Sequence, residues 1–295
     1  MYPFRFLAVF FCLTVAMRAG DAPRKLAFER DGVYVANLDG TSQKKIAEGA
    51  NPHPSPDGTH LAFNTETNTS AERHIAIADL STGKVKIVQG IPSNNCYGPV
   101  WSPDGSTIIF HAMKDKDWQL GLMEADGGHF RYFEPKVQVG TAGLNSIAWT
   151  PDSQGFYAQD LDSLYHFALD GTLKDKRDAN KLIPRGAFNS NNQFTVLPDG
   201  HTLLVDADMD EKVMHKDWDG PPPAVWTVDL TSGKATRISP KGFFAWLPCR
   251  VSDSEIICSA QPEKATTQWS LYRLSMDGKK RTLIVKNANF PSVSR

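Results

Sequence analysis

Residues 100–110 read VWSPDGSTIIF, a pattern that predicts a tight antiparallel hairpin. Pro103 fixes φ at the first central position of a type I turn, Asp104 suits the second, and Gly105 suits the exit. The β-branched and aromatic residues on both sides favour strands. Because the same pattern returns as HPSPDGTHLAF at 53–63 and AWTPDSQGFYA at 148–158, the chain contains a structural repeat.

Two interleaved turn signals define the repeating unit. The first falls at Pro56, Pro103, Pro151, Pro198 and Ser252, with intervals of 47, 48, 47 and 54 residues. The second is a glycine after an Asp- or Ser-containing turn, found at Gly40, Gly83, Gly127, Gly171, Gly233 and Gly278. Each unit then has four antiparallel strands in about 45 residues, which is typical of a β-propeller blade. Six glycine turns predict an all-β, six-bladed β-propeller.

The two ends of the repeat predict how the ring closes. Residues 289–295, NFPSVSR, match the first strand of a blade, while residues 24–40 supply the second, third and fourth strands. We therefore expect the last blade to be closed by N- and C-terminal strands, which leaves no long free sheet edge. A two-sheet sandwich would explain many strands but not their fixed period.

Residues 1–19 predict a secretory signal peptide. Arg5 precedes an apolar run over 6–16, small residues follow, and the run is too short to span a membrane well. A buried first strand is the alternative. Cleavage would leave a propeller over 22–295 in the periplasm or outside the cell, with no transmembrane segment. A net charge of -1 argues against nucleic-acid binding.

The motifs PxWSPDGxxIxF and LxxxDLxxGxxxxI resemble the WD40-like PD40 repeats of TolB-type propellers. The resemblance covers about residues 22–295 and leaves no room for the N-terminal domain that TolB carries. It implies a non-catalytic, monomeric binding scaffold without a cofactor, whose partner is an envelope or extracellular protein, peptide or glycan. The repeats also resemble those of oligogalacturonate lyases and of prolyl-oligopeptidase-type peptidases. The Gly-x-Ser-x-Gly elbow of a hydrolase domain does not occur in the sequence.

The longer connections should gather on the face opposite the short turns, and binding residues concentrate on such loops. They are 64–74, 111–119, 206–224 and 259–270. The residues that begin the innermost strands should ring the channel mouth on this loop face. Amides there can hydrogen-bond a peptide or sugar, and aromatic rings can stack on it. The alternative is that Asn and Gly at these positions only meet the backbone requirements of the turns where the chain enters each blade. The predicted ligand-binding residues are Asn51, Tyr97, Asn145, Asn192, Gln193, Trp246 and Asn289.

Two weaker patterns suggest a metal. Asp206, Asp208 and Asp210 alternate as in a Ca²⁺ loop, but Glu211 stands where that loop needs glycine. His53 and His111 could approach one Ca²⁺ or Mn²⁺ ion on the loop face, together with His215. A solvated acidic loop and packing histidines are the simpler interpretation. With the lyase resemblance, these residues give the alternative of a metal-assisted polysaccharide lyase or hydrolase.

Three cysteines follow the leader: Cys96, Cys249 and Cys258. Cys249 and Cys258 would face each other if the intervening turn were centred between residues 253 and 254. A shift of one residue in the pairing separates them, so the sequence leaves a disulfide open.

Overall fold

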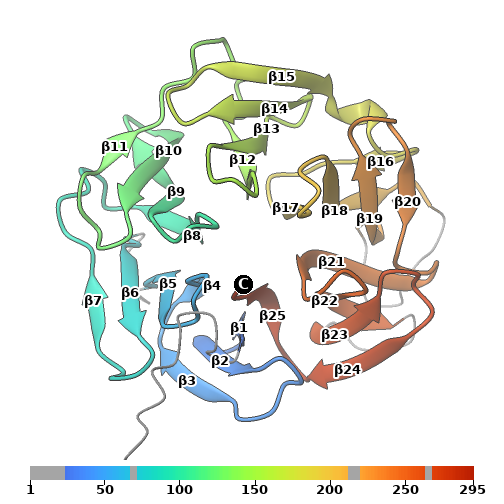
Figure 1. The fold of residues 1–295 in the computed structure, drawn as a ribbon, viewed down its shortest axis with the longest axis horizontal. Helices are drawn as coiled ribbons and strands as arrows, with labels where there is room; N and C mark the ends of the chain where they lie inside the picture. The colour runs from blue at the N-terminus through green and yellow to red at the C-terminus, as the bar shows by residue number, and fades with distance from the viewer. Residues whose placement is uncertain (1–23, 67–71, 212–219, 263–267) are drawn as a thin grey trace, which may run out of the picture.

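A computed structural model describes residues 24–66, 72–211, 220–262 and 268–295. In these ranges six antiparallel sheets follow one another in chain order around a central axis (Figure 1). This confirms the six-bladed propeller. The predicted signal peptide at 1–19 lies outside the described residues.

Each blade runs from an innermost strand at the channel to an outermost strand at the rim, and we name the blades A to F. Blade A consists of β25 (Asn289–Val293), β1 (Lys25–Glu29), β2 (Val33–Asn37) and β3 (Lys44–Ala47). Blade B consists of β4 (Ala50–Pro54), β5 (His60–Asn64), β6 (Ile75–Asp79) and β7 (Val85–Ile87). Blade C consists of β8 (Cys96–Trp101), β9 (Thr107–Lys114), β10 (Asp117–Glu124) and β11 (Arg131–Tyr132).

The second half of the ring repeats this order. Blade D consists of β12 (Asn145–Trp149), β13 (Gly155–Gln159), β14 (Ser163–Ala168) and β15 (Leu173–Asp178). Blade E consists of β17 (Phe194–Val196), β18 (Thr202–Met209), β19 (Pro223–Asp229) and β20 (Ala235–Arg237), with a fifth strand, β16 (Gly186–Ala187), also paired to β18. A short 3-10 helix, η1 (Ala179–Lys181), precedes it. Blade F consists of β21 (Phe243–Arg250), β22 (Glu255–Pro262), β23 (Ser270–Ser275) and β24 (Arg281–Val285).

Blade A closes the ring with both ends of the described chain, as the sequence predicts. In the register of β1 with β25, Leu26 lies opposite Val293 and Glu29 lies opposite Asn289. The Arg24 Nε donates to the carbonyl of Ser294 at 2.8 Å. Strands separated by more than 250 residues are therefore locked into one sheet.

The core consists of apolar layers between neighbouring blades. Leu26 and Phe28 of blade A pack with Ile257 of blade F, while Ala27 on the other face packs with Phe63 of blade B. Both faces of β1 are thus buried between neighbouring blades. Deleting a large buried side chain such as Phe28 should cost about 3 to 5 kcal/mol.

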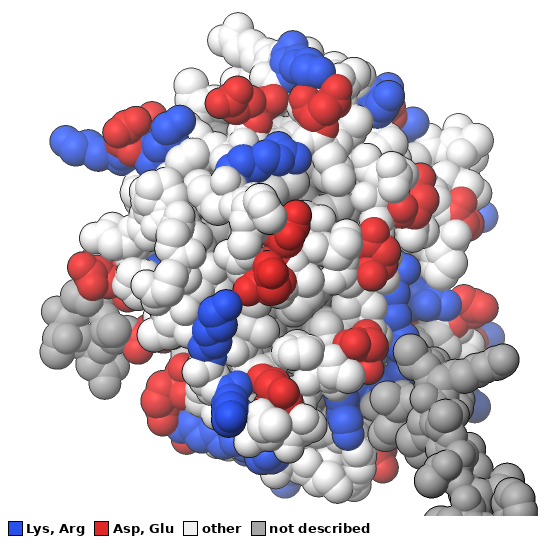
Figure 2. Space-filling view, turned by 60° about the vertical axis from the view of Figure 1, so that its left-hand side comes forward, with Lys and Arg blue, Asp and Glu red and all other residues white. Residues whose placement is uncertain are grey.

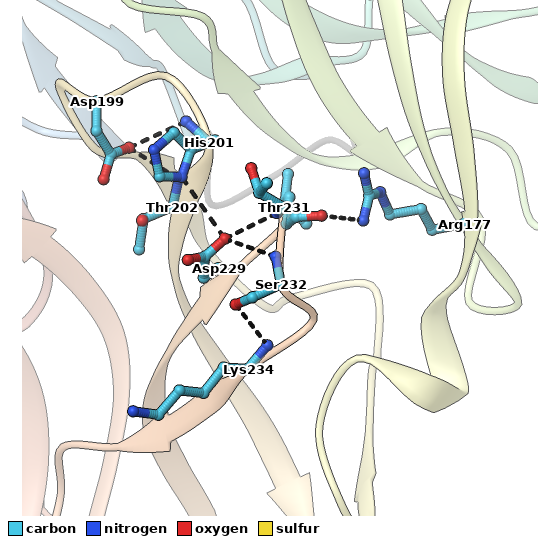
Figure 3. A network of polar contacts seen from close by, with 9 residues as sticks. Arg177, Asp199, His201, Thr202, Asp229, Thr231, Ser232 and Lys234 are labelled. Carbon is cyan, nitrogen blue, oxygen red and sulfur yellow. Dashed lines mark hydrogen bonds and ion pairs between the residues drawn. The ribbon is translucent and has the colours of Figure 1, made fainter.

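Aspartates hold the short turns in place. In blade E, Asp199 accepts from the backbone N–H groups of His201 and Thr202, and Asp229 accepts from those of Thr231 and Ser232 (Figure 3). Burial opposes ionisation of Asp199, but its hydrogen bonds together outweigh burial and lower its pKa. The backbone bonds from Ser232 and Thr231 lower the pKa of Asp229 against a smaller effect of burial. The aspartates therefore fix the turn-face backbone.

The side wall of the ring carries no large field of one sign in the view that brings blades B and C forward (Figure 2). Lys and Arg lie interspersed with Asp and Glu there. Mixed charge of this kind suits a solvated outer surface rather than a docking site for a polyanion.

One local expectation needs correction, and the structure answers the open question of the disulfide. Residues 111–119 do not form a long loop, because β9 and β10 extend until Lys114 pairs with Asp117. Asp115 and Lys116 both have positive φ, as a two-residue hairpin turn requires. Cys249 lies opposite Ile257 rather than Cys258, because a bulge after Trp246 shifts the register, and both thiols are free.

Candidate ligand-binding channel

The six innermost strands enclose a central channel of about 750 Å³. One end opens among the connections between blades, which we call the loop-face mouth. The other opens among the Pro-Asp-Gly turns, which we call the turn-face end. The volume lies within the range of small-molecule and cofactor sites.

A backbone bulge shapes the mouth. The pairing register shifts near the start of the innermost strand in five blades, and each shift includes one residue in the left-handed conformation. A bulge of this type re-aims side chains at the rim of a sheet. The five left-handed residues, all on the channel wall, are Asn51, Gly98, Ser146, Leu247 and Phe290.

A ring of polar side chains lies behind these bulges, at the same position of the second strand in every blade. Three of them accept a backbone N–H from the next blade: Glu29 from Asn51 at 3.1 Å, Asn64 from Gly98 at 3.3 Å, and Asp206 from Leu247 at 3.2 Å. They therefore join neighbouring blades at the mouth. The full set is Glu29, Asn64, His111, Gln159, Asp206 and Ser259.

This ring was not predicted, although the sequence carries a signal for it. One polar residue recurs at an equivalent place in otherwise apolar second strands. Asp206 is the most buried acid of the ring, and burial raises its pKa to about 7. Asn192 Nδ2 at 2.7 Å and Gln193 N at 2.8 Å donate to its carboxyl group and oppose that shift.

Blade C presents an aromatic cluster with a cation at the mouth. The Tyr97 ring stacks on His111 with centroids 4.7 Å apart and meets Trp118 edge-on at 4.8 Å. The Arg73 guanidinium lies over Tyr97 at 4.7 Å and near Trp118 at 5.5 Å. Asn95 Oδ1 accepts from Arg73 Nε at 2.8 Å, so the guanidinium is held in place. Arg73 and Trp118 were not predicted, because they come from outer strands and their loops.

A second aromatic cluster lies across the ring. Trp246 of blade F is 5.0 Å from Trp269 and 6.0 Å from Phe290 of blade A, measured between ring centroids. Blades C and F face each other across the axis (Figure 1). Aromatic groups therefore flank the mouth from opposite sides.

The predicted ligand-binding residues take two kinds of position. Asn51, Tyr97, Asn192 and Gln193 line the channel, whereas Asn145, Trp246 and Asn289 lie behind its wall. The Asn145 Nδ2 donates to the carbonyls of Ala142 and Gly143, both at 3.3 Å. Asn192 binds Asp206 and the N–H of Asn189, so its amide serves the fold.

Comparison with known proteins gives a likeness of fold. No family model matches the sequence, and no curated protein matches it. TolB from Acinetobacter baumannii superposes with a TM-score of 0.68 at 17% identity, covering 92% of this chain and 66% of that chain. The chain has a TolB-like propeller fold.

Two further solved structures extend the comparison. A putative TolB from Agrobacterium tumefaciens has a TM-score of 0.62 at 15% identity, covering 92% of each chain. An oligogalacturonate lyase in complex with manganese has a TM-score of 0.52 at 13% identity, covering 86% of this chain and 70% of that chain. The described residues of the TolB-like propeller contain no helix long and apolar enough to cross a membrane.

The predicted metal ligands of the TolB-like propeller do not converge within the described residues, where no three His, Cys, Asp or Glu side chains form a group. His53 Nδ1 accepts from the Trp101 N–H at 3.4 Å, and His111 Nε2 bonds the Leu144 carbonyl at 3.1 Å. Burial lowers the pKa of both histidines to about 4.

The aspartates predicted as metal ligands are likewise engaged in separate contacts. Asp206 and Asp208 lie in β18, where Asp208 accepts from Asn189 at 2.9 Å, and Asp210 pairs with Arg185 at 3.0 Å. Residues 212–219, which include His215 and would complete the Ca²⁺ pattern, lie outside the described residues.

Proposed function

We propose that this TolB-like propeller is an exported, non-catalytic scaffold that binds an envelope or extracellular protein, peptide or glycan at its loop-face mouth. The observation that carries the proposal is a pair of aromatic groups on opposite sides of one channel opening: Tyr97 with Trp118, and Phe290, which Trp246 packs against from behind. Rigid rings bury large areas at little entropic cost and dominate the energetics of many interfaces.

The polar groups at the mouth fit the same role. The side-chain amides of Asn51, Asn191 and Gln193 line the channel and have no hydrogen bond within the described part of the chain. They can therefore bond the backbone of a peptide or the hydroxyls of a sugar. Arg73, held by Asn95, adds a charge-assisted donor for an acidic group on the ligand.

The titratable groups at the mouth serve the fold. His111 is buried, stacked under Tyr97, and bonded to the next blade through Nε2. Its low pKa keeps it neutral at pH 7, and Asp206 is enclosed by three N–H donors. These arrangements favour binding over acid–base catalysis.

Matched variants test binding at the mouth. The protein is used to capture partners from envelope extract and a glycan panel, and each captured species is retested with Tyr97→Ala and Trp118→Ala. Each variant should weaken capture by about 2 kcal/mol, the usual threshold for a hot spot. Gly83→Asp and Gly233→Asp are the controls: the space around both turn-face glycines is open, but both have positive φ, so thermal unfolding must show that each control is folded.

Loss of capture in the turn-face controls, with Tyr97→Ala and Trp118→Ala folded and still binding, would contradict a mouth site. Export is tested separately by fractionating cells and determining the N-terminus of the protein. A cytoplasmic protein that retains residues 1–19 would contradict export.

The alternative is a metal-assisted polysaccharide lyase or hydrolase; its one supporting observation is that His53 and His111 both line the channel, although they form no metal-binding group within the described residues. Metal analysis of purified protein, followed by assay on polygalacturonate with added Mn²⁺ or Ca²⁺, tests it. Bound metal near one equivalent and activity that His111→Gln abolishes would support the enzyme. Folded protein without either would contradict it.

A further inference from the structure

The turn-face end of the channel shows a break in the repeat. Four blades place the proline of the Pro-Asp-Gly turn on the channel wall, and these are Pro56, Pro103, Pro151 and Pro198. The equivalent position is Ser252 in blade F and Arg295 in blade A. The departures therefore lie in two adjacent blades and form one arc of the rim (Figure 1).

Three arginines line that arc: Arg24, Arg250 and Arg295. Arg24 comes just before β1, Arg250 ends β21, and Arg295 follows β25. Arg250 lowers the pKa of both Arg24 and Arg295, after the larger effect of burial, so the three like charges lie within electrostatic reach of one another.

The three guanidinium groups differ in their existing partners. Arg24 donates to the carbonyls of Ser294 and Val251, which orients it without neutralising it. Arg250 binds Asp253 at 2.5 Å. The negative charge of Asp104 acts on Arg295 and raises its pKa, against the larger effects of burial and Arg250. Within the described residues Arg24 and Arg295 make no ion pair, so N–H donors of both remain for a ligand.

We propose that Arg24, Arg250 and Arg295 form an oxoanion-binding site at the turn-face end of the channel, separate from the loop-face mouth. Guanidinium groups present planar forks of donors that match the oxygens of a phosphate or a carboxylate. The four prolines form the rest of this rim and give it rigid apolar walls. An anion there relieves the repulsion among the three arginines.

Titration of the full chain with inorganic phosphate, at constant ionic strength set by chloride, tests the site. Calorimetry should show saturable binding near one equivalent. The thermal midpoint should rise with phosphate concentration as expected from the dissociation constant that calorimetry gives. A parallel titration with succinate distinguishes a phosphate from a carboxylate ligand. Saturable binding of either anion supports the site.

Matched variants locate the binding. Arg295→Gln should weaken it about tenfold or more, because a hydrogen bond between charged groups is lost, and Arg250→Gln should act similarly. Arg131→Gln is the control, since this arginine lies on the outer strand of blade C and bonds the Leu169 carbonyl. The control should bind as the unmodified chain does.

Two outcomes would overturn the proposal. In the first, the thermal midpoint rises linearly with phosphate or succinate concentration, without saturation, and rises equally in Arg295→Gln. Such a rise is the general effect of salts that are excluded from the protein surface. The other is saturable binding that Arg131→Gln weakens as much as Arg295→Gln does. Neither outcome affects binding at the mouth, so the two proposals fail independently.

Discussion

The loop-face mouth carries aromatic rings and free amides, whereas the turn-face end of the same channel carries prolines and arginines. At the mouth the backbone bulge repeats around the ring while the side chains change from blade to blade. At the turn-face end the same side chain, a proline, repeats in four blades, and only blades A and F lack it. The comparison indicates that features shared by the blades form the scaffold, whereas side chains that depart from the repeat form the candidate binding sites.

The largest expected effect comes from removing the strand that serves both ends of the channel. Deleting residues 289–295 removes β25, the inner strand of blade A, together with the Ser292 Oγ bond to the Pro52 carbonyl at 2.6 Å. We expect loss of the cooperative fold, because the stability of a whole domain is only about 5 to 15 kcal/mol. Thermal unfolding followed by circular dichroism measures it.

Deleting Arg295 alone is the control for that experiment. It leaves β25 intact, so the fold should persist while the turn-face end loses one charge. Cooperative unfolding at an unchanged midpoint after deletion of 289–295 would contradict the assigned closure.

The next effect concerns the mouth and is seen in the pH dependence of stability. His111 has a pKa of about 4 in the fold against 6.5 when unfolded, so the folded state binds fewer protons between these values. Stability is therefore full above about pH 6.5 and falls as the pH drops toward 4. His111→Gln should remove about 2 to 3 kcal/mol of the loss between pH 7 and 4.5.

Chemical denaturation at several pH values measures this slope, which a uniform destabilisation of the variant does not change. His129→Gln is the control, because this histidine is 82% exposed and lies away from the channel wall. Asp206 acts in the opposite direction, since its raised pKa adds stability as the pH falls from about 7 toward 4. An unchanged slope in His111→Gln would show that the imidazole is not buried as described.

A smaller effect compares one glycine at each end of the channel. Gly98 at the mouth has φ +64 and Gly105 at the turn face has φ +75, and an added Cβ meets its nearest neighbour at 3.7 Å in both cases. Because the cost is backbone strain alone, Gly98→Ala and Gly105→Ala should each destabilise the protein by about 1 to 2 kcal/mol. Equilibrium unfolding measures both.

Only Gly98→Ala should also weaken capture of a partner at the mouth. Equal losses of capture in the two variants, with both folded, would remove the distinction between the ends.

The smallest effect is a shift in the pKa of one histidine. Arg295 contributes to the low pKa of His53, whereas Arg73 acts on His111. Phosphate bound at the turn-face arginines should offset the charge of Arg295 and raise the pKa of His53 by a few tenths, about 0.5 kcal/mol. NMR titration of the imidazole resonances measures it, and an equal shift at His111 would show that the ends are not independent.

The turn motifs predicted the fold well, because Pro103, Asp104 and Gly105 act locally and their period counts the blades. They also predicted where the inner strands of blades A to D begin, whereas β17 begins only at Phe194 and β21 begins already at Phe243. They could not predict that Asn192 binds Asp206 or that Arg73 lies on Tyr97, since those contacts depend on the bulge and on strands paired across a blade. The arginine arc joins residues more than 200 positions apart, and only the loss of proline at Ser252 and Arg295 hinted at it.

Closure by β25 has a consequence for the order of folding. Blades B to F are each built from strands that follow one another along the chain, so each can form soon after its residues leave the ribosome. The face of β1 that carries Leu26 and Phe28 stays uncovered until blade F has been made, and the inner edge of β1 stays unpaired until residues 289–293 arrive. Contacts of such long sequence separation slow folding. The N-terminal strand is therefore the segment most exposed to aggregation or chaperone binding during synthesis.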